Sequence, residues 1–127
     1  MGYGQAAVCA ATLCRENSYD PVDAWCLAVQ EHIPTKSGRM KGCPKSTFLG
    51  LCSAGRVIGI NSGNYTRSID NRNYAITAVE ILQNQEPGHT PEAAELWGRV
   101  MAVHEKSIKR NGQMEVVLAL WDKGMIR

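Results

Sequence analysis

Half of the basic residues in this chain fall between positions 36 and 72, where they could bind an anion. This segment holds 7 of the 14 Lys and Arg side chains and a single Asp, whereas the formal net charge of the chain is only +2. Clustered Lys and Arg attract phosphate and carboxylate groups and donate hydrogen bonds to them. The segment therefore predicts an anion-binding face, formed by Lys36, Arg39, Lys41, Lys45, Arg56, Arg67 and Arg72.

Acidic and basic segments alternate along the sequence, which leaves two interpretations open. Counting Lys and Arg against Asp and Glu gives −3 for residues 1–35, +6 for 36–72, −4 for 73–105 and +3 for 106–127. Opposite segments could attract each other within the fold, although exposed pairs contribute only about 0–1 kcal/mol each. The alternative is an external partner, namely nucleic acid, a phosphorylated ligand or an acidic protein.

A polar stretch overlaps the end of the basic segment and is the best candidate for a pocket. Between Asn61 and Tyr74 the side chains are either turn-forming or ligand-contacting, and we include Asn64 and Tyr65 with Arg67 and Arg72 in the predicted site. We expect the site to combine this stretch with the break between Pro34 and Cys43.

The cysteines and histidines give no recognisable catalytic or metal-binding motif. Five cysteines occur without a Cys-x-x-Cys pair, so we predict no metal site, no cofactor, and reduced, core-type thiols of a cytoplasmic protein. His104-Glu105 lacks the second histidine of a zinc protease because Ile108 stands in its place. Cysteine–histidine catalysis between residues that meet only in space remains open, and Cys26 and His32 are not well placed for it.

The elements that must position these residues follow from a tandem repeat. Trp25-x6-His32 is followed by a basic stretch and an apolar run ending in Gly55, and Trp97-x6-His104 is followed by a similar series ending in Gly124. Upstream, the alanine-rich run near Ala7 matches the run near Ala75. The offset between matched positions drifts from 68 to 72, as small loop insertions produce. We predict two copies, roughly residues 1–60 and 68–127, in one domain with pseudo-twofold symmetry.

Each copy is predicted to contain three helices, which makes the domain mostly α-helical with about six helices. Spacings of three and four between apolar residues indicate first helices over 5–16 and 69–84. Asp20 and Thr90, each followed by proline, indicate second helices over 21–33 and 91–110. The third helices begin near Pro44 or after residue 111 and end at the glycines. His32 is expected at a helix end, His104 in mid-helix beside Trp97, and the three tryptophans in the core.

Bulk composition limits the classes of protein to consider. The chain has 127 residues, 44% of them apolar, which suits one globular domain with a substantial core. No apolar stretch is long enough to span a membrane, and the first residues lack the pattern of a signal peptide. A basic third helix would suit a helix-turn-helix, but the run Phe48–Cys52 offers few polar groups to read bases.

Three segments of the chain form distinctive motifs: Cys43–Cys52, Gly63–Ser68 and Val116–Trp121. With these motifs the chain resembles a group of short bacterial proteins of unknown function, some of them carried on mobile gene cassettes. The resemblance covers most of the chain and implies a bacterial, cytosolic, stand-alone domain. It implies no catalytic residues.

These observations predict a non-enzymatic binding module with a basic face for an anion or the nucleic acid backbone. Two alternatives remain, a homo-oligomeric interaction domain that uses an apolar third-helix face, and a small enzyme with an unrecognised pocket.

Overall fold

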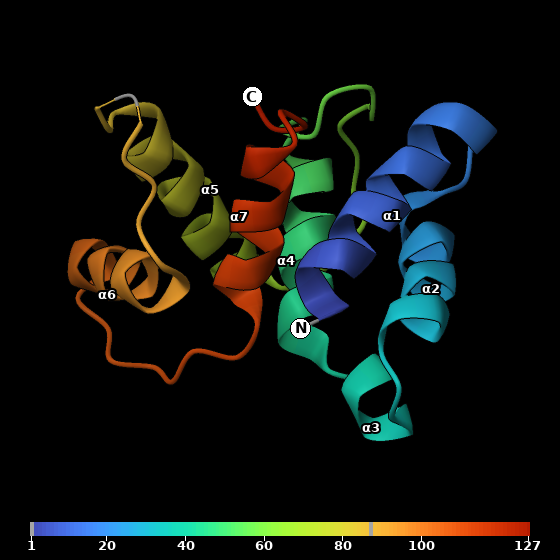
Figure 1. The fold of residues 1–127 in the computed structure, drawn as a ribbon, viewed down its shortest axis with the longest axis horizontal. Helices are drawn as coiled ribbons and strands as arrows, with labels where there is room; N and C mark the ends of the chain where they lie inside the picture. Colours follow the sequence, from blue (N-terminus) through green and yellow to red (C-terminus); the bar gives the residue numbers. More distant parts are fainter. Residues whose placement is uncertain (1, 87) are drawn as a thin grey trace.

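The computed structural model describes residues 2–86 and 88–127, and the described chain is α-helical, as predicted (Figure 1). Six helices have ten or more residues, and one short helix, α3, lies in the basic approach to α4. The described residues contain no strand beyond one isolated bridge. In chain order the helices are α1 (Gly2–Asn17), α2 (Pro21–His32), α3 (Lys36–Arg39), α4 (Gly42–Ser53), α5 (Ile69–Gln83), α6 (Ala93–His104) and α7 (Gln113–Asp122).

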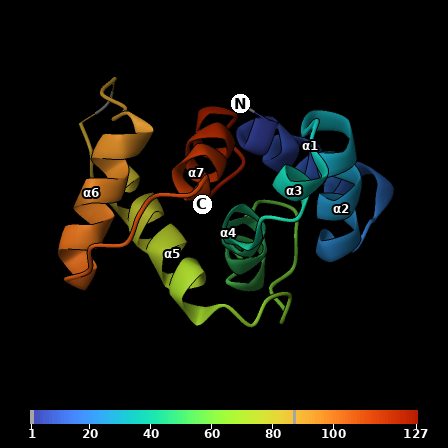
Figure 2. The same ribbon diagram turned by 90° about the horizontal axis from the view of Figure 1, so that it is seen from below.

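The two predicted third helices, α4 and α7, occupy the middle of the molecule. The α1–α2 pair lies on one side of them and the α5–α6 pair on the other (Figures 1 and 2). Each third helix packs against the first helix of the other half, so that α7 contacts α1 and α4 contacts α5. This exchange is what a twofold axis between α4 and α7 would produce; the duplication itself stays a prediction.

The α1–α7 and α4–α5 interfaces also have close backbone contacts at positions that the repeat pairs with each other. A Cβ atom added to Gly4 would lie 2.8 Å from the Cβ of Ala119, and one added to Gly50 would lie 2.7 Å from the Cα of Arg72. The repeat pairs Gly4 with Arg72 (offset 68) and Gly50 with Ala119 (offset 69). In both interfaces a glycine therefore lets the helices approach closely at the same point.

Both third helices end in the same way. Gly55 and Gly124 adopt left-handed conformations, with φ of 72° and 67°. The following amides close the turn, because Arg56 N donates to Leu51 O and Met125 N donates to Leu120 O, each at 2.9 Å. Val57 then forms the isolated antiparallel bridge with Ile126.

The second helix of the second half differs most from the prediction. Asp20 caps α2 as predicted and accepts a hydrogen bond from Val22 N at 3.0 Å, but α6 begins at Ala93 with Glu92, not Thr90, as its N-cap. It ends at His104 because Glu105 is left-handed (φ 54°). The segment beyond it turns back along the helix, where Trp97 Nε1 donates to Ile108 O at 2.8 Å.

The core confirms two of the three predicted aromatic anchors. Trp25 and Trp97 are buried, whereas Trp121 is only partly buried and packs against the core from outside. The apolar run of α4 is buried within the molecule, and every residue from Thr47 to Ser53 is covered. Among the described residues, no helix has both the length and the apolar character needed to cross a membrane.

Candidate functional site

Tyr3 joins the segments that precede the two central helices. Its hydroxyl donates to Gly38 O at 2.8 Å, which ties α1 to α3. Gly112, at the start of α7, lies so close that an added Cβ would be 3.1 Å from the Tyr3 ring and 3.0 Å from Pro44 Cγ. The left-handed φ of Gly112, 84°, also favours glycine. The beginnings of α4 and α7 are therefore neighbours, along the lower edge of Figure 1.

A cationic cavity of about 350 Å³ lies where these segments meet, lined by Lys41, Lys109, Arg110 and Asn111. Lys41 Nζ donates to Asn111 Oδ1 at 3.1 Å and so links the two halves. Arg110 pairs with Glu115 at 2.8 Å. Across residues 2–86 and 88–127, no carboxylate lies within 4 Å of Lys41 or Lys109. This cavity has an excess of positive charge.

The backbone adds to the positive character of the cavity. Lys41 and Gly112 are the N-cap residues of α4 and α7, and neither helix start receives a side-chain capping bond. The first amides of a helix carry a partial positive charge and donate to anions. An anion near Lys41 and Asn111 would thus face two helix starts as well as the side chains.

Three other predicted basic residues lie nearby. Arg39 and Lys45 line a second cavity of about 270 Å³, together with Trp25. Arg39 is partly committed to the fold, because its Nε donates to Ile33 O at 2.7 Å beyond the end of α2. Lys36 is exposed on α3.

The remaining predicted residues are not brought to this place. Arg56 follows α4, and Tyr65 is held at the same end because its N donates to Ser53 Oγ at 3.0 Å. Asn64 is exposed beside it, while Arg67 and Arg72 lie at the start of α5. A 12-residue helix is about 18 Å long, so Arg56, Asn64 and Tyr65 lie at the opposite end of α4 from the α3 region and do not form one pocket with it. Arg72 packs against Gly50 within α4.

Lys109, Arg110 and Asn111 were missed by the sequence analysis as site residues. The signal that could have found them is the repeat, because the basic stretch 106–110 in the second half corresponds to the stretch around Lys36 and Arg39. Both stretches are basic in the sequence, and the fold brings them together.

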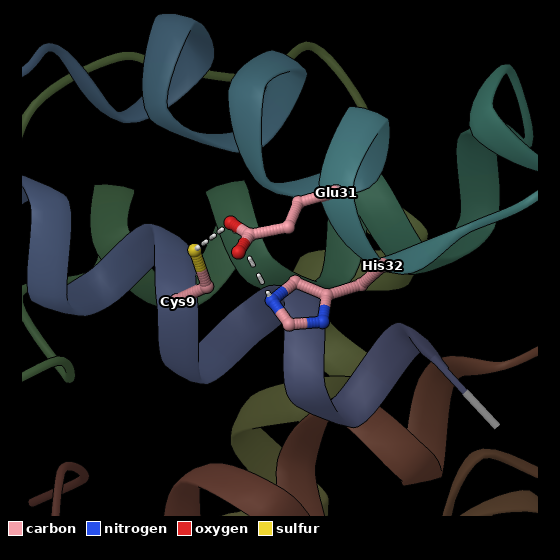
Figure 3. A group of neighbouring side chains, drawn as sticks. All are labelled: Cys9, Glu31 and His32. Atoms are coloured by element: carbon pink, nitrogen blue, oxygen red, sulfur yellow. Dashed lines mark hydrogen bonds and ion pairs between the residues drawn. The ribbon is translucent and has the colours of Figure 1, made fainter.

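A second cluster, also unpredicted, joins α1 to the last turn of α2. Cys9 points from α1 toward Glu31 and His32 (Figure 3). The Cys9 thiol lies 3.8 Å from Glu31 Oε2, and His32 Nε2 lies 3.9 Å from the same oxygen. Burial, and then the Glu31 carboxylate, raise the pKa of the Cys9 thiol. Because the carboxylate rather than the imidazole contacts the thiol, this arrangement does not activate a cysteine nucleophile.

His104 occupies the corresponding place in the second half. It is the last residue of α6, not a mid-helix residue as predicted, and its Nε2 lies 2.8 Å from Thr77 Oγ1. Its ring packs against Tyr74 at a centroid distance of 5.0 Å, and Tyr74 in turn packs edge-on against Trp97. This histidine is a packing residue.

Comparison with known proteins identifies a family but not an activity. Neither the curated proteins nor the solved structures give a match to this chain. A model described as a family of unknown function, DUF6979, matches residues 1–127. The fold, the cationic cavity and the Cys9 cluster are thus features of a chain that belongs to this family of unknown function.

Proposed function

We propose that this protein is a non-enzymatic module that binds phosphate groups of a polyanion, with the nucleic acid backbone as its main ligand. The observation that carries the proposal is the cavity lined by Lys41, Lys109, Arg110 and Asn111 between two helix starts. Three cations face one space, and only Arg110 has a carboxylate partner in the described chain. Such an arrangement gives an anion both charge and hydrogen-bond donors.

The burial of α4 favours contact with the backbone rather than with bases. A recognition helix must present polar side chains to the major groove. All residues from Thr47 to Ser53 are buried, so this part of α4 has no side chain to offer. We therefore propose binding without sequence specificity.

The same burial weakens the grounds for the oligomer alternative. That hypothesis relied on an apolar third-helix face, and in α4 this face is covered by the other helices of the same chain. The enzyme alternative relied on an unrecognised pocket, and the thiol of the Cys9 cluster is not activated.

The proposed setting is the bacterial cytoplasm. All five cysteines are unpaired in the structure, and reduced thiols are typical of proteins in that compartment. The bacterial origin comes from the resemblance described above.

A salt series tests the proposal directly. Duplex DNA, single-stranded DNA and RNA are titrated with the full chain at several salt concentrations, and binding is followed by fluorescence anisotropy. If three cations contact phosphates, the logarithm of the affinity for duplex DNA should fall with the logarithm of salt with a slope of about −3. Absence of binding to all three at low salt would contradict the proposal.

Matched variants locate the site. Lys41→Gln and Lys109→Gln should each weaken binding and reduce the slope by about one. Lys123→Gln, at the far end of α7, is the control and should leave the slope unchanged. Equal effects of all three variants would mean that charge is sensed by the whole surface rather than by the cavity.

Glu115 provides a variant of opposite sign. Its carboxylate is the partner of Arg110, so Glu115→Gln should release that guanidinium and strengthen binding to DNA several-fold. Weaker binding of Glu115→Gln would indicate that the ion pair positions Arg110 for the ligand.

A further inference from the structure

We infer that Cys9, Glu31 and His32 form a site for Zn²⁺ with one coordination position left open. The three residues offer a thiol sulfur, a carboxylate oxygen and an imidazole nitrogen, the donor types that zinc takes in proteins. These atoms all lie within 4.8 Å of one another, and no other such group of Cys, His, Asp and Glu occurs in the described chain. The site is separate from the cationic cavity.

The spacing of the three atoms is close to what a zinc ion requires. Bond lengths of about 2.0–2.3 Å and tetrahedral angles place ligand atoms about 3.3–3.6 Å apart. The distances from Glu31 Oε2 to Cys9 Sγ and to His32 Nε2 are 3.8 and 3.9 Å. The Glu31 side chain is 71% exposed, so its carboxylate can move a few tenths of an ångström without disturbing the core. The Cys9 sulfur and the His32 nitrogen lie within 4.8 Å of each other, and small rotations of these two side chains would bring them to zinc-ligand spacing.

The charges also favour a divalent cation. A thiolate and a carboxylate together neutralise Zn²⁺. Glu31 and His32 are the last two residues of α2, and the carbonyl end of a helix carries a partial negative charge. Sulfur and nitrogen donors select against Mg²⁺ and Ca²⁺, which prefer oxygen ligands.

The second half of the molecule provides an internal comparison. The repeat pairs Cys9 with Thr77 (offset 68), and it pairs Glu31 and His32 with Val103 and His104 (offset 72). There the histidine simply hydrogen-bonds Thr77 at 2.8 Å. The histidine position is therefore shared, and what distinguishes the first half is a sulfur and a carboxylate in place of a hydroxyl and an isopropyl group. Both differences add metal ligands.

Space for a fourth, non-protein ligand lies beside the cluster. Cys9 and His32 line a mainly apolar cavity of about 350 Å³ between α1, α2 and α7. Three protein ligands with an open position are typical of zinc sites that bind a water molecule or a substrate. Val8 and Ala119 form apolar parts of the wall, and Asp122 and Lys123 add opposite charges to it.

Zinc titration of the full chain, without a histidine tag and freed of metal with a chelator, tests the inference. Calorimetry should show one Zn²⁺ per chain and no uptake of Mg²⁺, and Co²⁺ should give the absorption of a thiolate–cobalt bond. Cys9→Ser, Glu31→Gln and His32→Gln should each weaken zinc binding by at least about tenfold, a loss that even an outer-shell change can cause. Zinc should also protect the Cys9 thiol from alkylation.

Cys26→Ser is the matched control, because Cys26 is an exposed cysteine on α2 outside the cluster. It should bind zinc like the unaltered chain. No zinc binding, or binding that is lost in Cys26→Ser and kept in Cys9→Ser, would overturn the inference.

A gain of binding gives an independent test. Thr77→Cys combined with Val103→Glu supplies the second half with the same three donors around His104, and the stoichiometry should rise from one zinc to two. Circular dichroism would verify that the helices are retained. A folded double variant that still binds a single zinc would overturn the conclusion that these positions make the site.

Discussion

At the scale of single residues, two cysteines have raised pKa values in the folded chain. They therefore stay protonated at a pH where the unfolded chain would lose these protons. Burial, and then the nearby Asp20 carboxylate, raise the pKa of Cys14 to about 11. Burial raises the pKa of Cys52 further. Both values lie above the ordinary cysteine pKa of about 8.5, so the folded chain keeps these protons at a pH where the unfolded chain has lost them.

Stability should therefore fall as the pH rises from about 9 to 11. The free energy of unfolding, measured by urea denaturation at each pH, should decrease in this window, and Cys14→Ala should reduce the slope. Cys26→Ala removes an exposed thiol and is the control that should leave the slope as it is. Identical slopes for Cys14→Ala and the unaltered chain would contradict this explanation.

At the scale of elements, the close contact of α4 with α5 depends on Gly50. An added Cβ would lie 2.7 Å from the Cα of Arg72, and since that atom is backbone, the two helices would have to separate. Gly50→Ala should lower the free energy of unfolding by about 1–3 kcal/mol, the usual cost of overpacking, in spite of the higher helix propensity of alanine.

Gly98 offers the matched control for this substitution. It lies within α6 and is exposed, and an added Cβ would meet nothing within 4 Å. Gly98→Ala should therefore stabilise the protein by up to about 1 kcal/mol through helix propensity alone. A loss of stability in Gly98→Ala comparable to that in Gly50→Ala would show that packing is not the cause.

The elements differ in how well they could be predicted from the sequence. The six longer helices, the Asp20 cap and the glycine ends were predictable because each depends on residues near in sequence, whereas the short helix α3 was not predicted. The early end of α6 was not predictable, because it depends on a hydrogen bond from Trp97 to Ile108. No local sequence pattern indicates the turn between these two residues. The cationic cavity depends on Tyr3 and Gly112, which bring distant basic stretches together. The Cys9 cluster, likewise, needs the packing of α1 on α2 before its residues become neighbours.

At the scale of the whole molecule, the exchanged packing predicts that neither half folds alone. α1 needs α7 and α5 needs α4 to cover their inner faces. Fragments 1–62 and 63–127, divided within the exposed stretch after Ile60, should each show weak helical circular dichroism. Mixed at equal concentration, they should regain the helical signal and a cooperative thermal transition. Separate fragments that are monomeric and fully helical would contradict the prediction.

The bridge between Val57 and Ile126 is the contact that the predicted duplication would produce at a twofold axis. The repeat pairs these positions with each other (offset 69), so each bonds to its own counterpart. In a dimer of identical half-length chains, one residue would pair with itself across the symmetry axis, and each subunit would lend its first helix to its partner. Such an intertwined dimer would hold two equivalent histidine positions. Fusion into one chain would free the copies to differ, with cysteine and glutamate in one half and threonine and valine in the other.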